Sequence, residues 1–201
     1  MKKNKNLIII IIFSILFILL TINILIQKTP TIDLKTIDYI SKIRTDKLTN
    51  IFTKITNIGS SYSLIVLSIL FFINFKEKKY PIAIALNLTA AFIISQLIKL
   101  IINRPRPIGI ALVEASGFSY PSGHTMVSTA YFGFLIYLIL KNISNKVLKI
   151  IATTFLTIIP ILIGISRIYL GVHYLTDIIA GILLAIIYLI IFTKLYTKKG
   201  A

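Results

Sequence analysis

Long apolar runs, separated by short charged or turn-forming segments, constrain this chain more than any other feature of its sequence. A helix needs about 20 apolar residues to cross a bilayer, and the run from Leu7 to Ile26 has that length. Five further runs lie within residues 62–75, 81–102, 124–140, 150–165 and 174–192. With 57% hydrophobic residues, the chain of 201 residues is too apolar for a soluble domain of its size. The sequence predicts a single all-α domain over residues 1–201, a polytopic membrane protein with six transmembrane helices.

Two N-terminal segments leave alternatives open. A signal peptide is the alternative for the first run, but the run is long for one. The Gln27-Lys28-Thr29-Pro30 stretch that follows does not resemble a small-residue cleavage site, so we expect an uncleaved span. In residues 31–58, apolar side chains recur at helical spacing among polar ones, which predicts an amphipathic helix, whole or broken, on the membrane surface. An ordinary connector explains this segment equally well.

Charge gives a prediction of topology. Basic residues outnumber acidic ones by 22 to 6, and the lysines gather in short clusters, which favours topology signals and head-group contacts over nucleic-acid binding. The clusters at both termini, at 76–79 and at 141–149 fall on one side of a six-span arrangement, which the positive-inside rule assigns to the cytoplasm. Segments 27–60, 103–123 and 166–173 then lie outside the plasma membrane. Segment 27–60 is itself basic, which weakens the bias without reversing it.

Few residue types remain for chemistry. The chain has no cysteine, which excludes disulfides, thiolate nucleophiles and cysteine metal sites. Its two histidines are too few for a multi-histidine zinc site, so we expect no metal and no cofactor. Both histidines lie in three polar stretches that the topology puts on the same, outer side.

The first stretch, residues 99–107, carries three cations. Lys99 lies near the end of an apolar run, where a charge usually has a partner or a function, although a lysine near a helix end can also reach the interface by itself. Arg104 and Arg106 follow in a turn stiffened by prolines. The planar guanidinium group suits phosphate oxygens, so the cluster predicts an anion site.

The second stretch, Pro121-Ser122-Gly123-His124, stands where the fourth predicted span begins. Free backbone N–H groups make a helix N-terminus an anion site, and Ser122 adds a hydroxyl donor. Gly123 lets the backbone approach a ligand closely, and His124 is positioned to give or take a proton. A simple helix cap is the alternative explanation.

The third stretch, residues 166–177, holds Arg167, His173 and Asp177 between apolar runs. A spacing of four puts His173 and Asp177 on one face of a helix. The carboxylate can then hold one ring nitrogen and leave the other free to attack. The alternative is that His173 and Asp177 have no catalytic role and only extend their polar ends to the membrane boundary.

Together the three stretches resemble the signature of the type 2 phosphatidic acid phosphatase superfamily. Its pattern is Lys, six residues, Arg-Pro; then Pro-Ser-Gly-His; then Ser-Arg, five residues, His, three residues, Asp. Residues 99–107, 121–124 and 166–177 match every motif residue and spacing, so the motif-bearing region covers about 99–177. The six-span arrangement is similar to the membrane-bound branch. The apolar spans argue against the soluble acid phosphatases and vanadium haloperoxidases of the same superfamily.

The resemblance implies roles for the residues that bind phosphate. Lys99, Arg106 and Arg167 would hold the non-bridging oxygens, while Ser122 and the Gly123 amide would add hydrogen bonds. Three cations can stabilise phosphoryl transfer without Mg²⁺.

The resemblance also assigns the chemical steps. His173 would attack phosphorus to form a phosphohistidine, Asp177 would fix its tautomer, and His124 would protonate the leaving oxygen and then help activate water. The family motif assigns no role to Arg104. Its side chain could contact a second phosphate or a lipid head group, or make no functional contact.

The implied substrate is a lipid phosphate or diphosphate whose tail stays in the bilayer. Undecaprenyl diphosphate is the first choice by family analogy, with phosphatidylglycerophosphate and phosphatidic acid as alternatives. A transporter or channel would spread its cations over several depths, whereas here they gather at one side. A non-catalytic lipid-binding relative would be expected to lack His173 or Asp177, and both are present.

Overall fold

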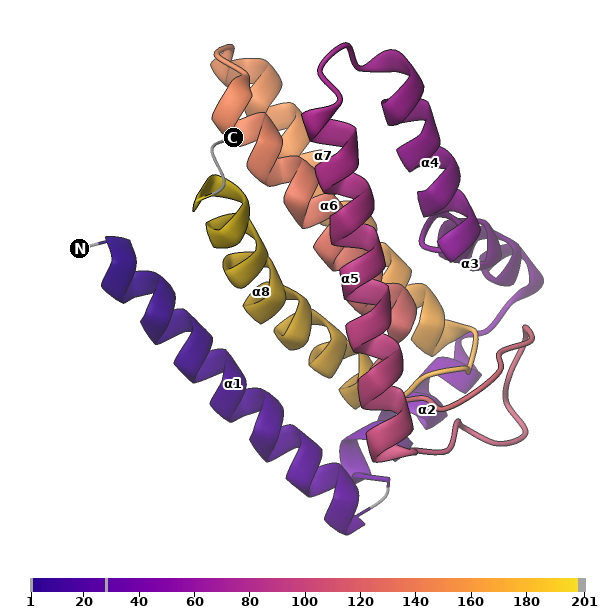
Figure 1. Cartoon of the computed structure of the whole chain (residues 1–201). Coiled ribbons are helices and arrows are strands. Elements are labelled where there is room, and N and C mark those ends of the chain that lie inside the picture. The colour runs from indigo at the N-terminus through magenta and orange to yellow at the C-terminus, as the bar shows by residue number, and fades with distance from the viewer. Residues whose placement is uncertain (1, 28, 199–201) are drawn as a thin grey trace.

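The computed structural model describes residues 2–27 and 29–198, which form eight helices and no strand (Figure 1). The all-α prediction is therefore confirmed. In chain order the helices are α1 (Lys2–Gln27), α2 (Thr31–Lys42), α3 (Asp46–Ile58), α4 (Ser61–Asn74), α5 (Lys79–Ile102), α6 (Gly123–Asn142), α7 (Lys146–Tyr169) and α8 (Leu175–Lys198).

Helix α6 is the centre of the bundle and contacts α4, α5, α7 and α8. Its buried side chains Met126, Tyr131 and Phe134 pack in one core with Leu64 of α4 and Ile163 of α7. Helix α1, by contrast, lies mainly along α8, and only 6% of its apolar window is buried (Figure 1). Because most side chains of α1 remain exposed beside α8, its apolar surface suits lipid tails.

Five helices are long and apolar enough to cross a membrane: α1, α5, α6, α7 and α8. The predicted span at 62–75 corresponds to α4, whose 14 residues reach only about two thirds of the hydrocarbon thickness. Helices α3 and α4 qualify together as a sixth, broken span, bent by 48°. The chain is a polytopic membrane protein, and residues 2–27 and 29–198 offer five single helices and one bent pair as its spans.

The segment expected to be an amphipathic helix or a connector forms α2 and the separate α3. The hydroxyl of Thr45 caps α3 by accepting a hydrogen bond from the Leu48 amide at 3.3 Å, which explains the break. Helix α3 packs along α7, and α2 contacts both α7 and α8. Helix α3 thus belongs to the bundle instead of lying only on the membrane surface.

The loop between α5 and α6 folds back onto the turn between α7 and α8. Helix α5 ends at Asn103 in the left-handed backbone region, and further along the loop the Leu112 amide donates to the carbonyl oxygen of Leu170 at 2.9 Å. Gly171 has φ +72°, and a Cβ there would lie 2.2 Å from the Ile110 carbonyl oxygen, so this close approach requires glycine. The three motif stretches consequently meet at one end of the bundle (Figure 1).

Candidate active site

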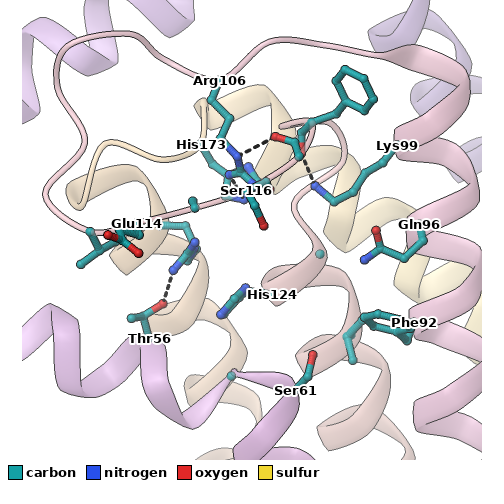
Figure 2. A pocket seen from close by; sticks show the side chains of 18 of the residues that line it. Thr56, Ser61, Phe92, Gln96, Lys99, Arg106, Glu114, Ser116, His124 and His173 are labelled. Carbon is teal, nitrogen blue, oxygen red and sulfur yellow. Dashed lines mark hydrogen bonds between the residues drawn. The ribbon is translucent and has the colours of Figure 1, made fainter.

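The three motif stretches surround one cavity of about 570 Å³. Helices α3, α5, α6 and α7 and the first residue of α4 line it together with the loops before α6 and before α8 (Figure 2). Six of the eight predicted site residues line the cavity: Lys99, Arg106, Gly123, His124, Arg167 and His173. The other two, Ser122 and Asp177, are fully buried behind it.

Loop carbonyls hold two of the cations. Lys99, in the last turn of α5, donates through Nζ to the carbonyl oxygen of Phe118. Arg106 donates from Nε to the carbonyl oxygen of Gly117 at 3.0 Å and from one terminal nitrogen to that of Ser116 at 2.8 Å. Burial lowers the pKa of Arg106, yet its guanidinium stays charged because the pKa starts far above neutrality. Figure 2 shows both cationic ends on the same side of the cavity as His173.

Helix α3 holds the third cation. Arg167 is 5% exposed, and one terminal nitrogen donates to the Thr56 hydroxyl at 2.8 Å. Its Nε has no hydrogen-bond partner within residues 2–27 and 29–198. A buried donor without a partner is costly, so this N–H is available to an anion that enters the cavity.

His173 and Asp177 form the predicted pair. The Nδ1 atom of His173 lies 3.3 Å from Oδ2 of Asp177, and this oxygen also accepts from the Tyr174 amide at 2.9 Å. The other ring nitrogen, Nε2, lies 3.1 Å from a terminal nitrogen of Arg106. Burial lowers the pKa of His173 well below its ordinary value, and nearby cations, Arg106 first among them, lower it further. The imidazole is therefore neutral, with Nδ1–H donating to Asp177 and a lone pair on Nε2.

The N-terminus of α6 completes the site. The Ser122 hydroxyl oxygen accepts a hydrogen bond from the Thr125 amide at 3.5 Å and another from the Thr125 hydroxyl at 3.0 Å. Ser122 therefore caps α6, as the alternative explanation of a helix cap predicted. A Cβ on Gly123 would lie 3.3 Å from the Ser95 hydroxyl and 3.5 Å from Cε of Lys99. Glycine thus lets α5 bring its lysine against the first turn of α6, where His124 faces the cavity (Figure 2).

Sequence reasoning missed several residues of this site. Thr56 is one of many threonines in an amphipathic segment, and nothing in the local pattern marks it. Gln96 lies one helical turn before Lys99, a polar residue inside an apolar run that was a usable signal. Glu114 contributes an exposed carboxylate to the loop side of the cavity (Figure 2).

Arg104 is the residue for which the motif register gave no role. It does not line the cavity; it is buried behind it and forms ion pairs with Asp177 at 2.6 Å and Asp33 at 2.7 Å. The structure thus places Arg104 in a network of protein carboxylates, which the motif register did not indicate.

Comparison with known proteins agrees with this geometry. A family model described as the PAP2 superfamily matches residues 80–201. The chain belongs to the PAP2 superfamily. It is 32% identical over 155 residues to phosphatidylglycerophosphatase B of Bacillus subtilis (strain 168). The aligned residues make up 72% of this chain and 73% of that PAP2 relative.

Two further PAP2-type relatives are informative. Undecaprenyl-diphosphatase BcrC of Bacillus subtilis (strain 168) is 30% identical over 132 residues, or 63% of each chain. The crystal structure of the transmembrane PAP2 type phosphatidylglycerolphosphate phosphatase from Bacillus subtilis superposes with a TM-score of 0.85 at 26% identity, over 96% of this chain and 97% of that one. The chain is thus a membrane lipid phosphatase of the PAP2 family, a hydrolase that acts on phosphate esters.

Proposed function

We propose that this phosphatase transfers the phosphate of a membrane lipid to His173 and then to water. The observation that carries the proposal is the position of His173 Nε2, which faces a cavity lined by Lys99, Arg106 and Arg167. A neutral nucleophile next to three cations suits a reaction whose main needs are positioning and charge stabilisation. We assign the phosphate oxygens to these three side chains and to the free N–H groups of the first turn of α6, including Gly123.

Ser122 remains a proposed phosphate ligand. Its hydroxyl oxygen accepts both contacts from Thr125, which leaves its own proton to be donated. A phosphate oxygen at the N-terminus of α6 would accept that proton without disturbing the helix cap.

The first chemical step forms a bond from His173 Nε2 to the terminal phosphorus while the bond from that phosphorus to the oxygen on its lipid side breaks; for undecaprenyl diphosphate this is the bridging oxygen, and the lipid monophosphate leaves. Asp177 supports this step because it accepts from Nδ1 and so directs the lone pair to Nε2. The Arg106 nitrogen now 3.1 Å from Nε2 would donate to a phosphate oxygen instead. His124 gives its proton to this departing oxygen.

The second step releases inorganic phosphate. His124, now neutral, takes a proton from a water molecule whose oxygen attacks phosphorus, and the bond between phosphorus and Nε2 breaks. The electron pair returns to His173, which regains its neutral form. The two histidines thus alternate without any net change in the protein.

For the substrate we propose undecaprenyl diphosphate, with phosphatidylglycerophosphate as the second candidate. The first is supported by the relative named undecaprenyl-diphosphatase, and the second by the relative and the crystal structure named for phosphatidylglycerophosphate. Either lipid could leave its tail in the bilayer while its head group meets polar groups beyond the cations, such as Gln96 and Asn57. We also propose that the cavity opens outside the plasma membrane, with both termini in the cytoplasm, because the lysine clusters favour that orientation.

The test is a panel of lipid phosphates given to the purified full-length protein in detergent. We expect phosphate release from undecaprenyl diphosphate with the highest kcat/KM, and no release by His173→Ala protein on any lipid. A higher kcat/KM on phosphatidylglycerophosphate would replace the substrate and keep the mechanism. Unchanged turnover by the His173→Ala protein would remove the mechanism.

A further inference from the structure

Asp33 is the one residue of α2 that is buried, although the rest of that helix is amphipathic and apolar side chains such as Ile32 and Leu34 are exposed. Burying a carboxylate is costly unless it is paired and hydrogen-bonded. Asp33 has 0% exposure and accepts from the Thr176 amide at 3.0 Å, from the Thr176 hydroxyl at 2.6 Å and from Arg104 at 2.7 Å. The helix is therefore fixed to the bundle by a fully satisfied charge, in addition to the apolar contact of Ile40 with the cluster of Tyr169, Leu170 and Val172.

Arg104 joins this carboxylate to the catalytic one. One terminal nitrogen donates to Asp33, and the other donates to Asp177 Oδ1 at 2.6 Å and to the Thr176 hydroxyl at 2.8 Å. The guanidinium lies 4.0 Å from the centre of the Tyr174 ring, and the residue is 3% exposed. Two carboxylates and an aromatic face thus fix the plane of the group, which a point charge such as lysine cannot reproduce.

The two oxygens of Asp177 have separate partners. Oδ1 accepts from Arg104, whereas Oδ2 faces His173 Nδ1 and the Tyr174 amide. Because a carboxylate is planar, the bond from Arg104 to Oδ1 also sets the direction in which Oδ2 points. The orientation of the imidazole consequently depends on a chain of contacts that begins outside the cavity.

We infer that Arg104 and Asp33 are positioning residues for the phosphoryl transfer: Asp33 holds Arg104, Arg104 orients Asp177, and Asp177 aims His173. The inference rests on the proposed role of His173 as nucleophile. Neither Arg104 nor Asp33 lines the cavity, so both act through Asp177 and leave phosphate binding to the cations in front. Helix α2, outside the motif-bearing region, is part of the catalytic machinery by this route.

The test measures formation of the phosphoenzyme in a rapid-quench burst of nitrophenol from p-nitrophenyl phosphate, with the full-length protein. Loss of a residue that orients a metal ligand typically costs about 10–100-fold, and we expect Arg104→Lys, which disturbs the orientation of a nucleophile, to slow the burst by a factor of the same order. Inorganic phosphate, which tests the cradle and not the attack by His173, should bind within about twofold of wild type because the cradle is intact. Arg44→Lys is the matched control: Arg44 also fixes this end of the bundle, by donating to the Tyr169 carbonyl oxygen at 2.9 Å, and should leave the burst within about twofold.

A cycle with Asp177→Asn separates positioning from simple support of the fold. If Arg104 acts through Asp177, Arg104→Lys should slow the burst in wild type and add nothing in the Asp177→Asn background. Equal losses in both backgrounds, or weakened binding of inorganic phosphate, would overturn the inference. Asp33→Asn is the second variant if Arg104→Lys does not fold, with the same expectation of a loss that disappears in the Asp177→Asn background. A wild-type protein without any burst would instead refute the proposed function itself.

Discussion

The hydrogen bond from Arg167 to Thr56 offers a sharp test of how the cradle is held. Thr56→Val replaces the hydroxyl by a methyl group of similar shape and leaves one terminal nitrogen of a buried guanidinium without its partner at 2.8 Å. The Arg167 side chain keeps its charge but loses the contact that aims it from α7 across to α3. Its free Nε then meets the phosphate from a less defined direction.

The expected loss follows from the kind of contact removed. Hydrogen bonds to charged groups contribute about 1.5–3 kcal/mol, and water in a cavity of about 570 Å³ can replace part of this. We therefore expect a loss of about 1–2 kcal/mol of transition-state stabilisation, or about 5–30-fold in kcat/KM. Vanadate, which mimics pentacoordinate phosphorus, should lose affinity by a similar factor.

Thr53→Val is the matched control. Thr53 lies one turn earlier on α3 and lines the same cavity, but its hydroxyl donates to the Thr49 carbonyl oxygen at 2.8 Å within the helix. The assay is steady-state hydrolysis of a lipid phosphate, together with vanadate inhibition, for both variants. Equal kcat/KM values for the two variants would refute the argument that Thr56 holds Arg167.

Four further predictions follow from the site and the topology. His173→Ala should abolish the nitrophenol burst, whereas His124→Ala should spare the burst but slow hydrolysis of a lipid monophosphate by about 10²–10⁴-fold, because an alkoxide needs the proton and nitrophenolate does not; a burst in His173→Ala would reverse the roles. Activity should survive EDTA and be inhibited by vanadate, since cations hold the phosphate; complete loss that Mg²⁺ restores would count against the mechanism. Because burial and cations lower the pKa of His173, its ring stays neutral as the pH falls. Phosphoenzyme formation, corrected for substrate ionisation, should then keep its rate from about pH 7.5 to about pH 6, and a loss centred near pH ~6.5 would contradict this. Reporter fusions after Lys79 and after Gly109 should report the cytoplasm and the outside respectively, and a cytoplasmic signal after Gly109 would invert the topology.

The sequence predicted the membrane helices well because the bilayer dictates their length. It predicted α4 less well, since that helix crosses the membrane only together with α3, and the bend lies at Gly59 and Ser60. Because a break inside a span interrupts the apolar run, the sequence pattern predicts a polar segment followed by a separate short helix. The packing of α3 against α7 is a tertiary contact, which no local sequence pattern predicts.

The site residues were predicted where they follow local motifs and missed where their contacts are distant. Lys99, His124 and His173 stand in short stretches with fixed spacing, and all three line the cavity. Thr56 and Arg167 are separated by 111 residues in the sequence, and no periodic pattern of residues predicts a hydrogen bond between such distant positions. The ion pairs of Arg104 were missed for the same reason, because its partners lie 71 and 73 residues away on helices at opposite ends of the chain.

The contacts of Asp33 set an order for the biogenesis of the enzyme. Synthesis proceeds from the N-terminus, and Asp33 is made 71 residues before Arg104 and 143 residues before Thr176. Until both partners have been synthesised, its carboxylate lacks the contacts that allow burial, so we expect α2 to stay at the water-exposed surface. The site closes only after α8 has been inserted, and a nascent chain that stalls before Thr176 occupies the membrane without a working site.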